Sequence, residues 1–321
     1  MVKIVTVVGA TGAQGKGVVN AFLNDPAYQV RAITRNPSSD AGKSLATRGA
    51  EVVSADLNDV ESLKRAFAGS HVIFGMTNFA ESFVAYQSPT KAIEVESEQG
   101  INLARAAAAT STLEHYVWST LPNALSISGG KYLVPHFESK NRVDAYIRDK
   151  ESALLRKTTF FWVAFYSTNY AFPVFAPHLI PTAEKYLQFG SYAPNTPIYM
   201  IGDVSVNITP FIKAVVEQPE KTANGSIVVV STKEVTADEL LQTWAKVKGV
   251  KAQFVRVSGE AYRDIWPLWA EEIGLMMEFW DYSRERSWTE PSGAKVLSKE
   301  DLGLEVTAFQ GLEEAFKGLE L

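Results

Sequence analysis

The sequence predicts an α/β protein: a Rossmann-type, doubly wound parallel sheet with a smaller C-terminal α+β lobe. Short apolar, β-rich runs alternate with helical stretches over the first 125 residues. Strands as apolar as these are buried on both faces, which is typical of a parallel sheet covered by helices. A glycine-rich turn directly follows the first run, and 321 residues are enough for one large domain and a smaller lobe.

The β-rich runs and the helical stretches between them give the order of the expected elements. We expect strands at residues 4–8, 28–34, 51–55, 71–76, 115–120 and 159–165. We expect helices from the glycine turn to about residue 24 and at residues 60–68, 94–109 and 137–150.

The pattern becomes less regular after residue 130, and residues 170–199 contain five prolines with little periodicity. Thr236 and Glu239 have the spacing of a capping box, which predicts the start of a helix. In this half we expect strands at 227–230 and 251–257 and a helix at 236–248.

Composition excludes several classes of function. The net charge is −5 and there is no basic tract, which argues against direct binding of nucleic acid. There is no cysteine and the four histidines lie far apart, so we expect no metal site. No apolar run approaches the ~18 residues of a membrane span, and the first run is too short for a signal peptide. We expect a cytoplasmic location, or a nuclear one.

The glycine-rich turn has the sequence Gly9-Ala10-Thr11-Gly12-Ala13-Gln14-Gly15 and opens a helix. The first glycine permits the tight turn, the second lets a diphosphate approach the backbone, and the third lets the helix pack closely on the strand. Free N–H groups at the helix N-terminus then face the diphosphate. The turn therefore predicts a dinucleotide site, with a purely structural glycine turn as the alternative.

The end of the second strand indicates which dinucleotide binds. An NAD site would carry Asp or Glu about 20 residues after the turn. This chain has Arg35-Asn36 there, with Lys43 nearby. A cation suits the 2′-phosphate of NADP(H), and the alternative is a solvated surface arginine. Asp56-Leu57, after the third strand, stands where an adenine would lie, although Asp56 could equally be a helix cap.

These observations divide the chain into two parts. We expect an NADP(H)-binding domain over residues 1–169, with further strands contributed from about 197–232. Residues 170–321 would form a smaller lobe that binds a substrate or a partner.

With these residues in place, the chain resembles the NmrA-like family of atypical short-chain dehydrogenases/reductases, which are related to isoflavone and benzylic ether reductases. The resemblance spans most of the chain and is densest over residues 1–150. The matching segments are VVGATGAQGKGVV (7–19), VRAITRNP (30–37), ADLND (55–59), MTNF (76–79), EQGINLARAA (98–107), HYVWSTLPN (115–123) and HFESKNRVDAYIR (136–148). The resemblance implies a Rossmann domain that prefers NADP(H), with Thr77, Asn78 and Phe79 on the nicotinamide side.

The resemblance leaves two kinds of function open, because some members of the family sense the NADPH/NADP⁺ ratio as regulators and others are reductases. The usual short-chain reductase site combines Ser with Tyr-x-x-x-Lys, whereas this chain has His136-Phe-Glu-Ser-Lys140. The lysine is present and the tyrosine is absent. A reductase would then use Lys140, His136 or water as the proton donor, and a sensor would need no donor at all.

Helical spacing places His136, Lys140 and Asp144 on one face of a helix. We expect Lys140 to contact the cofactor and to pair with Asp144 or with a bound ribose or phosphate, since a lysine on a buried face needs a partner. Ser119 and Thr120 close the fifth strand, where hydroxyl groups would face the cofactor crevice. We take Ser119 as a third catalytic candidate and Thr120 as a substrate contact.

The second half of the chain is rich in aromatic residues and carries six of the seven tryptophans. Such side chains could wall an apolar pocket above the nicotinamide, and we expect Trp162, Tyr166 and Tyr170 to line it. The leading prediction is an NADPH-dependent reductase of a small apolar or aromatic carbonyl, enone or imine-type metabolite. The alternative is a non-catalytic NADP(H)-sensing regulator that binds a partner protein. A dehydratase or epimerase with a permanently bound cofactor is a third interpretation.

Overall fold

The computed structural model describes residues 2–319, and its largest layer is an eight-stranded sheet in which all neighbouring strands are parallel. The strand order is β14-β11-β6-β5-β4-β1-β2-β3. These strands are β1 (Lys3–Val8), β2 (Tyr28–Thr34), β3 (Glu51–Ser54), β4 (Val72–Gly75), β5 (His115–Thr120), β6 (Thr158–Val163), β11 (Ser226–Val230) and β14 (Val296–Leu297). The order reverses between β1 and β4, which is the switch point where such sheets bind ligands. The predicted doubly wound parallel sheet is confirmed.

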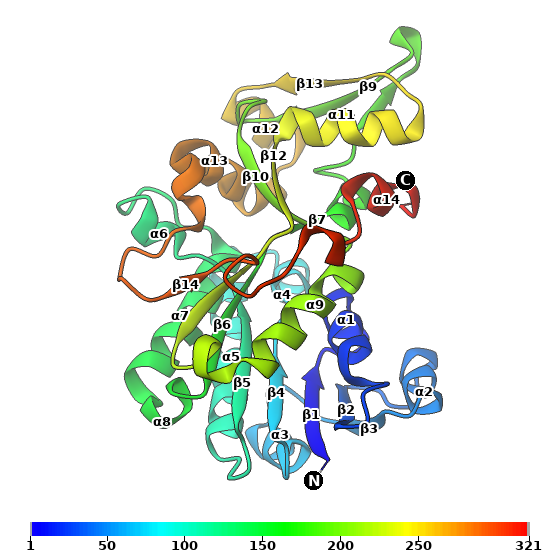
Figure 1. Ribbon diagram of the computed structural model, residues 1–321. Helices are drawn as coiled ribbons and strands as arrows, with labels where there is room; N and C mark the ends of the chain where they lie inside the picture. The colour runs from blue at the N-terminus through cyan, green and yellow to red at the C-terminus, as the bar shows by residue number, and fades with distance from the viewer. Residues whose placement is uncertain (1, 320–321) are drawn as a thin grey trace.

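Helices cover both faces of this sheet (Figure 1), and every residue of β5 and β6 is therefore buried. Helices α1 and α9 pack against each other, and α5 packs against α3 and α7 (Figure 1). The helices of this layer are α1 (Ala13–Phe22), α2 (Asp40–Thr47), α3 (Val60–Phe67), α4 (Phe79–Tyr86), α5 (Pro89–Ala108), α6 (Ala124–Ile127), α7 (Pro135–Lys150), α8 (Ser152–Leu155), α9 (Val204–Glu217) and α10 (Pro219–Thr222).

The smaller lobe is built around two three-stranded sheets, and Figure 1 places it beyond the carboxyl ends of the main strands. One sheet has the order β12-β10-β7 and the other β13-β9-β8. The strands are β7 (Phe165–Tyr166), β8 (His178–Ile180), β9 (Lys185–Gly190), β10 (Pro197–Gly202), β12 (Lys233–Thr236) and β13 (Ala252–Arg256). The helices are α11 (Ala237–Lys248), α12 (Gly259–Ile265), α13 (Ile273–Ser283) and α14 (Leu312–Lys317), with short 3-10 helices at Ser167–Ala171, Pro181–Ala183, Trp269–Glu271, Arg284–Trp288 and Val306–Ala308.

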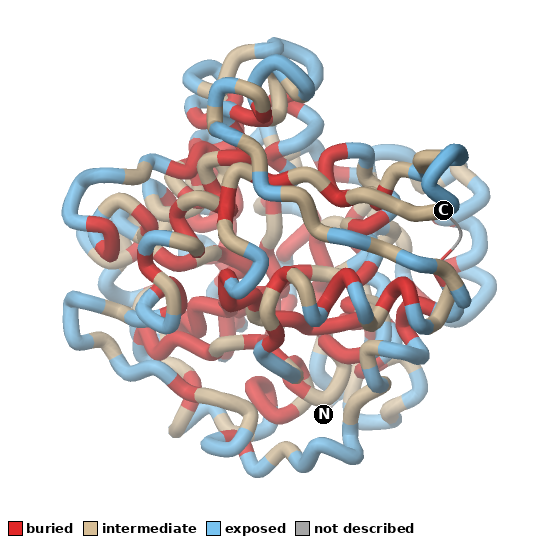
Figure 2. The backbone as a smooth tube through the Cα atoms, turned by 90° about the horizontal axis from the view of Figure 1, so that it is seen from above, coloured by how far each residue is buried: buried red, intermediate tan, exposed pale blue. Residues whose placement is uncertain are grey.

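One continuous apolar core joins the two parts. Figure 2 shows the buried residues gathered in the middle of the molecule and the exposed ones around it. The link is direct: β6 ends at Val163, and after Ala164 the chain enters β7 of the smaller lobe. The expected strand over 159–165 is therefore two strands in two sheets.

The observed elements agree with the expected ones where the sequence is periodic. The first five expected strands are each present as one strand, the sixth is divided between β6 and β7, and the capping box of Thr236 and Glu239 opens α11. Of the strands expected between 197 and 232, β11 lies in the large sheet, whereas β10 pairs with β7 and β12. Helix α9 and strand β14 were not expected. No helix within residues 2–319 is long and apolar enough to cross a membrane.

Candidate active site

A cavity of about 910 Å³ lies at the carboxyl ends of the central strands and extends into the smaller lobe. Both parts of the chain contribute to its wall. From the predicted set it is lined by Gly9, Thr11, Gly12, Ala13, Gln14, Arg35, Asp56, Leu57, Thr77, Asn78, Phe79, Ser119, Thr120, His136, Lys140 and Tyr166. Gly15, Asn36, Trp162 and Tyr170 are not among the lining residues.

The glycine turn has the geometry of an anion-binding loop. Gly9 has a φ of +68°, a conformation that favours glycine. A Cβ on Gly15 would lie 2.1 Å from the carbonyl oxygen of Gly9, so Gly15 allows α1 to pack on the turn and does not itself reach the cavity. Gly12 is the N-cap of α1 and supplies no side-chain cap, which leaves the helix N-terminus open toward the cavity.

Arg35 stands at the outer end of the cavity, with its side chain 72% exposed and in an ion pair with Glu81 of α4. A cation held at this edge is accessible to an anionic group. Asn36 is directed elsewhere, because its Oδ1 accepts a hydrogen bond from the Ser38 backbone at 3.1 Å. Asp56 lines the cavity and also accepts from the Asn58 backbone at 2.9 Å, so it stabilises its own turn.

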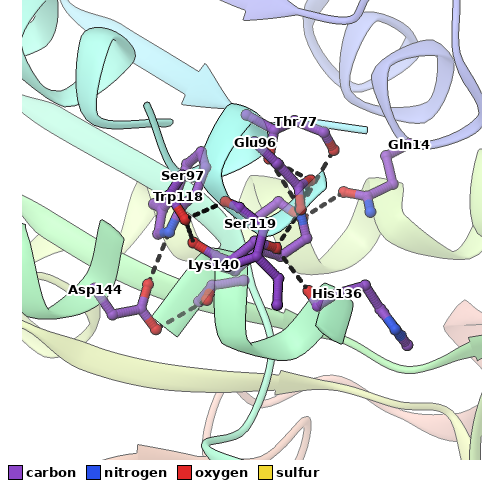
Figure 3. Close-up of polar contacts among 12 residues, drawn as sticks. Gln14, Thr77, Glu96, Ser97, Trp118, Ser119, His136, Lys140 and Asp144 are labelled. Carbon is purple, nitrogen blue, oxygen red and sulfur yellow. Dashed lines mark hydrogen bonds and ion pairs between the residues drawn. The ribbon is translucent and has the colours of Figure 1, made fainter. Parts of the chain in front are cut away.

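Lys140 belongs to a buried network, shown in Figure 3. Its Nζ donates to Glu96 Oε1 at 2.8 Å and to Thr77 Oγ1 at 2.9 Å. The Lys140 and Glu96 side chains are 11% and 1% exposed. Ser139 donates to the second oxygen of Glu96, so both oxygens of this carboxylate accept hydrogen bonds. The network fixes a cation at the edge of the cavity beside the end of β4.

The expected pairing of Lys140 with Asp144 is wrong. Asp144 instead accepts hydrogen bonds from Trp118 Nε1 and Thr120 Oγ1, both at 2.8 Å. Burial raises the pKa of Asp144 to about 7, against the opposing effect of these donors. Thr120 lines the cavity, but its hydroxyl group donates its proton to Asp144. That proton is therefore not available to a substrate.

A second polar chain joins three elements across the cavity. Ser119 Oγ donates to Gln14 Oε1 at 2.8 Å, and Gln14 Nε2 donates to the Tyr166 hydroxyl at 2.6 Å. Burial raises the pKa of Tyr166 to about 12, so its phenol stays protonated near neutral pH. Because the Tyr166 oxygen accepts from Gln14, its own proton is available to a ligand in the cavity.

His136 does not join Lys140, although both lie on α7. Its Nδ1 contacts Oε1 of Glu272, a buried residue immediately before α13. Figure 3 shows the His136 ring directed away from the Lys140 network. Glu272 is not among the predicted site residues, since nothing in its local sequence relates it to α7. Glu96 was not predicted either, although it is the one charged residue on the buried face of α5, and that pattern was a usable signal.

The far wall of the cavity is aromatic and comes largely from the smaller lobe. Trp269, Trp280 and Trp288 line it, and Phe172 packs on Trp269 with ring centroids 4.5 Å apart. Trp162, an expected pocket residue, lies behind this wall, with its ring 6.5 Å from that of Trp288.

Tyr170, another expected pocket residue, is also a core residue, because it is 1% exposed and packs on Phe316 of α14. The aromatic wall is thus real but uses later residues than expected. Within residues 2–319 no cluster of three or more His, Asp or Glu side chains could hold a metal ion.

Comparison with known families and proteins finds relatives along nearly the whole chain. The model of the NmrA-like family matches residues 1–306. The NmrA-like family domain-containing oxidoreductase hkm9 of Aspergillus hancockii is 31% identical over 261 residues, covering 78% of this chain and 74% of the relative. The corresponding oxidoreductase FrzB of a Cladobotryum species is 29% identical over 316 residues, covering 94% of this chain and 88% of the relative.

Solved structures share the fold over almost the full length. NmrA, described as a negative transcriptional regulator, has a TM-score of 0.74 at 18% identity and covers 99% of this chain and 96% of its own. Triphenylmethane reductase of Citrobacter sp., solved with NADP(H), has a TM-score of 0.66 at 21% identity and covers 98% and 99%. At these identities the likeness establishes the fold.

Proposed function

Because this chain belongs to the NmrA-like family, we propose that it is an NADPH-dependent reductase of a small apolar or aromatic metabolite. One observation carries the proposal: a single cavity of about 910 Å³ runs from the glycine turn to an aromatic wall. A sensor needs only the first part of such a cavity. The second part supplies room and apolar surface for an organic substrate.

The residues at the first part of the cavity fit NADP(H). The uncapped N-terminus of α1 suits the diphosphate, and Arg35 suits the adenosine 2′-phosphate. Lys140, held by Thr77 and Glu96, suits the nicotinamide ribose. When bound, the cofactor would supply a hydride. Solved relatives described as complexed with NADP(H) support this assignment.

The remaining polar groups would bind the substrate oxygen or nitrogen. Tyr166 carries an available hydroxyl proton and Ser119 is held beside it through Gln14. These hydroxyl groups would orient a carbonyl, while the proton would come from Lys140 or His136 in its protonated form, or from water. The apolar wall and the lack of a cluster of cations along the described lining support an apolar or aromatic substrate, and we propose a carbonyl, an enone or an imine as the group that is reduced. The relatives described as oxidoreductases support turnover.

The test follows NADPH absorbance in the presence of purified protein and a panel of aromatic ketones, enones, quinones and cyclic imines. We expect NADPH oxidation with at least one class, and a much lower rate with NADH. A Kd for NADPH, measured by fluorescence in parallel, shows that the protein is folded and loaded. Tight binding of NADPH with no oxidation across the panel would instead favour the sensor.

A further inference from the structure

We infer that Glu272 is a positioning residue that holds His136 as the proton donor to the substrate. This inference rests on the proposed function and deepens it. Glu272 comes from the smaller lobe and His136 from α7, and both line the cavity. The pair therefore joins the two parts of the protein at the place where a substrate would meet the cofactor.

The burial of the pair is the first argument. The side chains of His136 and Glu272 are 18% and 3% exposed. Nδ1 of His136 and Oε1 of Glu272 are in ion-pair contact, and within residues 2–319 neither of these two buried atoms makes a hydrogen bond. A buried carboxylate is costly unless it is paired. The imidazole nitrogen Nδ1 of His136 is thus the group that compensates the buried charge of Glu272.

The position of Glu272 in the chain is the second argument. It is the residue before α13 and could have capped that helix, but its side chain makes no capping hydrogen bond. The side chain is directed to His136 instead. Three residues earlier, Trp269 forms part of the aromatic wall. One short segment therefore positions both the apolar wall and the partner of the proposed donor.

The chemistry follows from which nitrogen the carboxylate holds. With Nδ1–H directed at Glu272, the other nitrogen, Nε2, is left for the cavity. The protonated ring gives its Nε2 proton to the oxygen of a carbonyl whose carbon receives the hydride. The C=O π bond would break, and a new O–H bond would form with the His136 proton and a new C–H bond with the hydride that bound NADPH would supply on oxidation to NADP⁺. His136 would be left neutral with Nδ1–H facing Glu272, and it would regain a proton from bulk solvent through the open cavity.

Lys140 then has a separate task. Its ammonium group is held by Glu96 and Thr77, away from the His136 ring. Phe79 and Phe137 flank that ring, with centroids 6.1 and 4.7 Å away. This division, with the lysine on the cofactor and the histidine on the substrate, explains how the site could work without the usual tyrosine.

The test compares Glu272→Gln with Glu271→Gln, the exposed neighbouring residue. We expect Glu272→Gln to lower kcat by about 10²-fold and to leave the KM and Kd for NADPH unchanged. Glu271→Gln should leave kcat, KM and Kd unchanged. Loss of the positioning carboxylate should add nothing to His136→Gln in the double variant. Equal kcat values for Glu272→Gln and wild type would overturn the inference.

A spectroscopic readout separates this inference from the proposed function. In ¹⁵N-edited spectra of the histidine side chains, His136 is assigned by the loss of its signals in His136→Gln. The neutral ring should be the Nδ1–H tautomer in wild type and shift toward Nε2–H in Glu272→Gln. An Nε2–H tautomer in wild type would overturn the inference even if NADPH is oxidised. If wild type oxidises no NADPH, the proposed function fails, whatever the tautomer.

The inference can still be tested if the Glu272→Gln variant fails to fold. If Glu272→Gln cannot be purified, His136→Gln takes its place, since His136 is partly exposed. The inference then requires the Nδ1–H tautomer in wild type and a loss of about 10²-fold in kcat for His136→Gln, with the Kd for NADPH unchanged. A His136→Gln variant with wild-type kcat would overturn it.

Discussion

The cofactor end and the substrate end of the cavity are encoded differently. At the cofactor end, the groups proposed to bind the diphosphate come from the backbone of one short segment, the turn from Gly9 to Gln14. At the substrate end, Trp269, Trp280 and Trp288 come from separate short elements that meet only in the folded chain. A site made of backbone groups therefore leaves a local sequence pattern, whereas a wall made of side chains depends on tertiary packing.

The largest expected effect concerns the buried network at the boundary between the two ends. Lys140→Met leaves the Glu96 carboxylate buried without its cation, and breaking such a pair costs about 3–5 kcal/mol. Lys140→Met combined with Glu96→Gln should recover much of that free energy of unfolding, because the remaining groups are neutral. Urea unfolding of both variants at pH 7 measures the difference. Equal stability would show that Glu96 is not held as the structure indicates.

The burial of Asp144 should make the free energy of unfolding depend on pH. Its folded pKa, raised by burial to about 7, lies above its ordinary value of 3.8. Its contribution to stability is therefore full below pH 4 and is lost as pH rises through 7. Against Asp144→Asn, which does not titrate, wild type should lose roughly 2–3 kcal/mol between pH 5 and pH 8. A constant difference across that range would contradict the raised pKa.

Gly15 and Gly12 test whether the turn is built as the pattern predicts. A Cβ on Gly15 would lie 2.1 Å from the Gly9 carbonyl oxygen, whereas on Gly12 the nearest atom is 3.3 Å away. Gly15→Ala should therefore cost about 1–3 kcal/mol of stability as well as cofactor binding. Gly12→Ala should fold nearly normally and bind NADPH less tightly, since it narrows the approach of the diphosphate. Thermal unfolding and fluorescence titration separate these outcomes.

Arg35 tests the choice of cofactor. A charge-assisted contact is worth roughly 1.5–3 kcal/mol, so Arg35→Ala should weaken NADPH binding about ten- to a hundredfold. NADH binding should stay almost unchanged, because NADH lacks the 2′-phosphate. Lys43→Ala is the control, since Lys43 does not line the cavity. Equal losses for both cofactors would refute the assignment of Arg35.

Sequence patterns predicted most of the sheet because its strands are apolar runs between helices, and those runs are local. The same patterns placed the glycine turn, Arg35 and Lys140 at the cavity. They failed for Asp144, where helical spacing suggested a partner for Lys140. Spacing along α7 shows which residues share a face, but Glu96 on the neighbouring helix lies closer to Lys140.

The prediction of the residues in the aromatic wall failed for a related reason. Trp162 lies on the predicted strand β6, yet the wall in front of it is made by Trp288, from a part of the chain 126 residues later. Aromatic content indicated that a wall was present without indicating which rings faced the cavity. Glu272 had no local signal at all, because its partner is on α7.

The smallest expected effect tests this distinction between front and rear tryptophans. Trp269 lines the cavity and is half-buried, so Trp269→Leu should raise the KM for an aromatic substrate. An aromatic contact is worth about 0.5–1.5 kcal/mol, which corresponds to roughly two- to twelvefold in KM. Trp162→Phe should lower thermal stability and leave that KM unchanged, because its ring lies behind Trp288. The KM for NADPH serves as the internal control in both variants. If Trp162→Phe raised the substrate KM as much as Trp269→Leu, the original expectation for Trp162 would be right and the wall would extend deeper than the structure indicates.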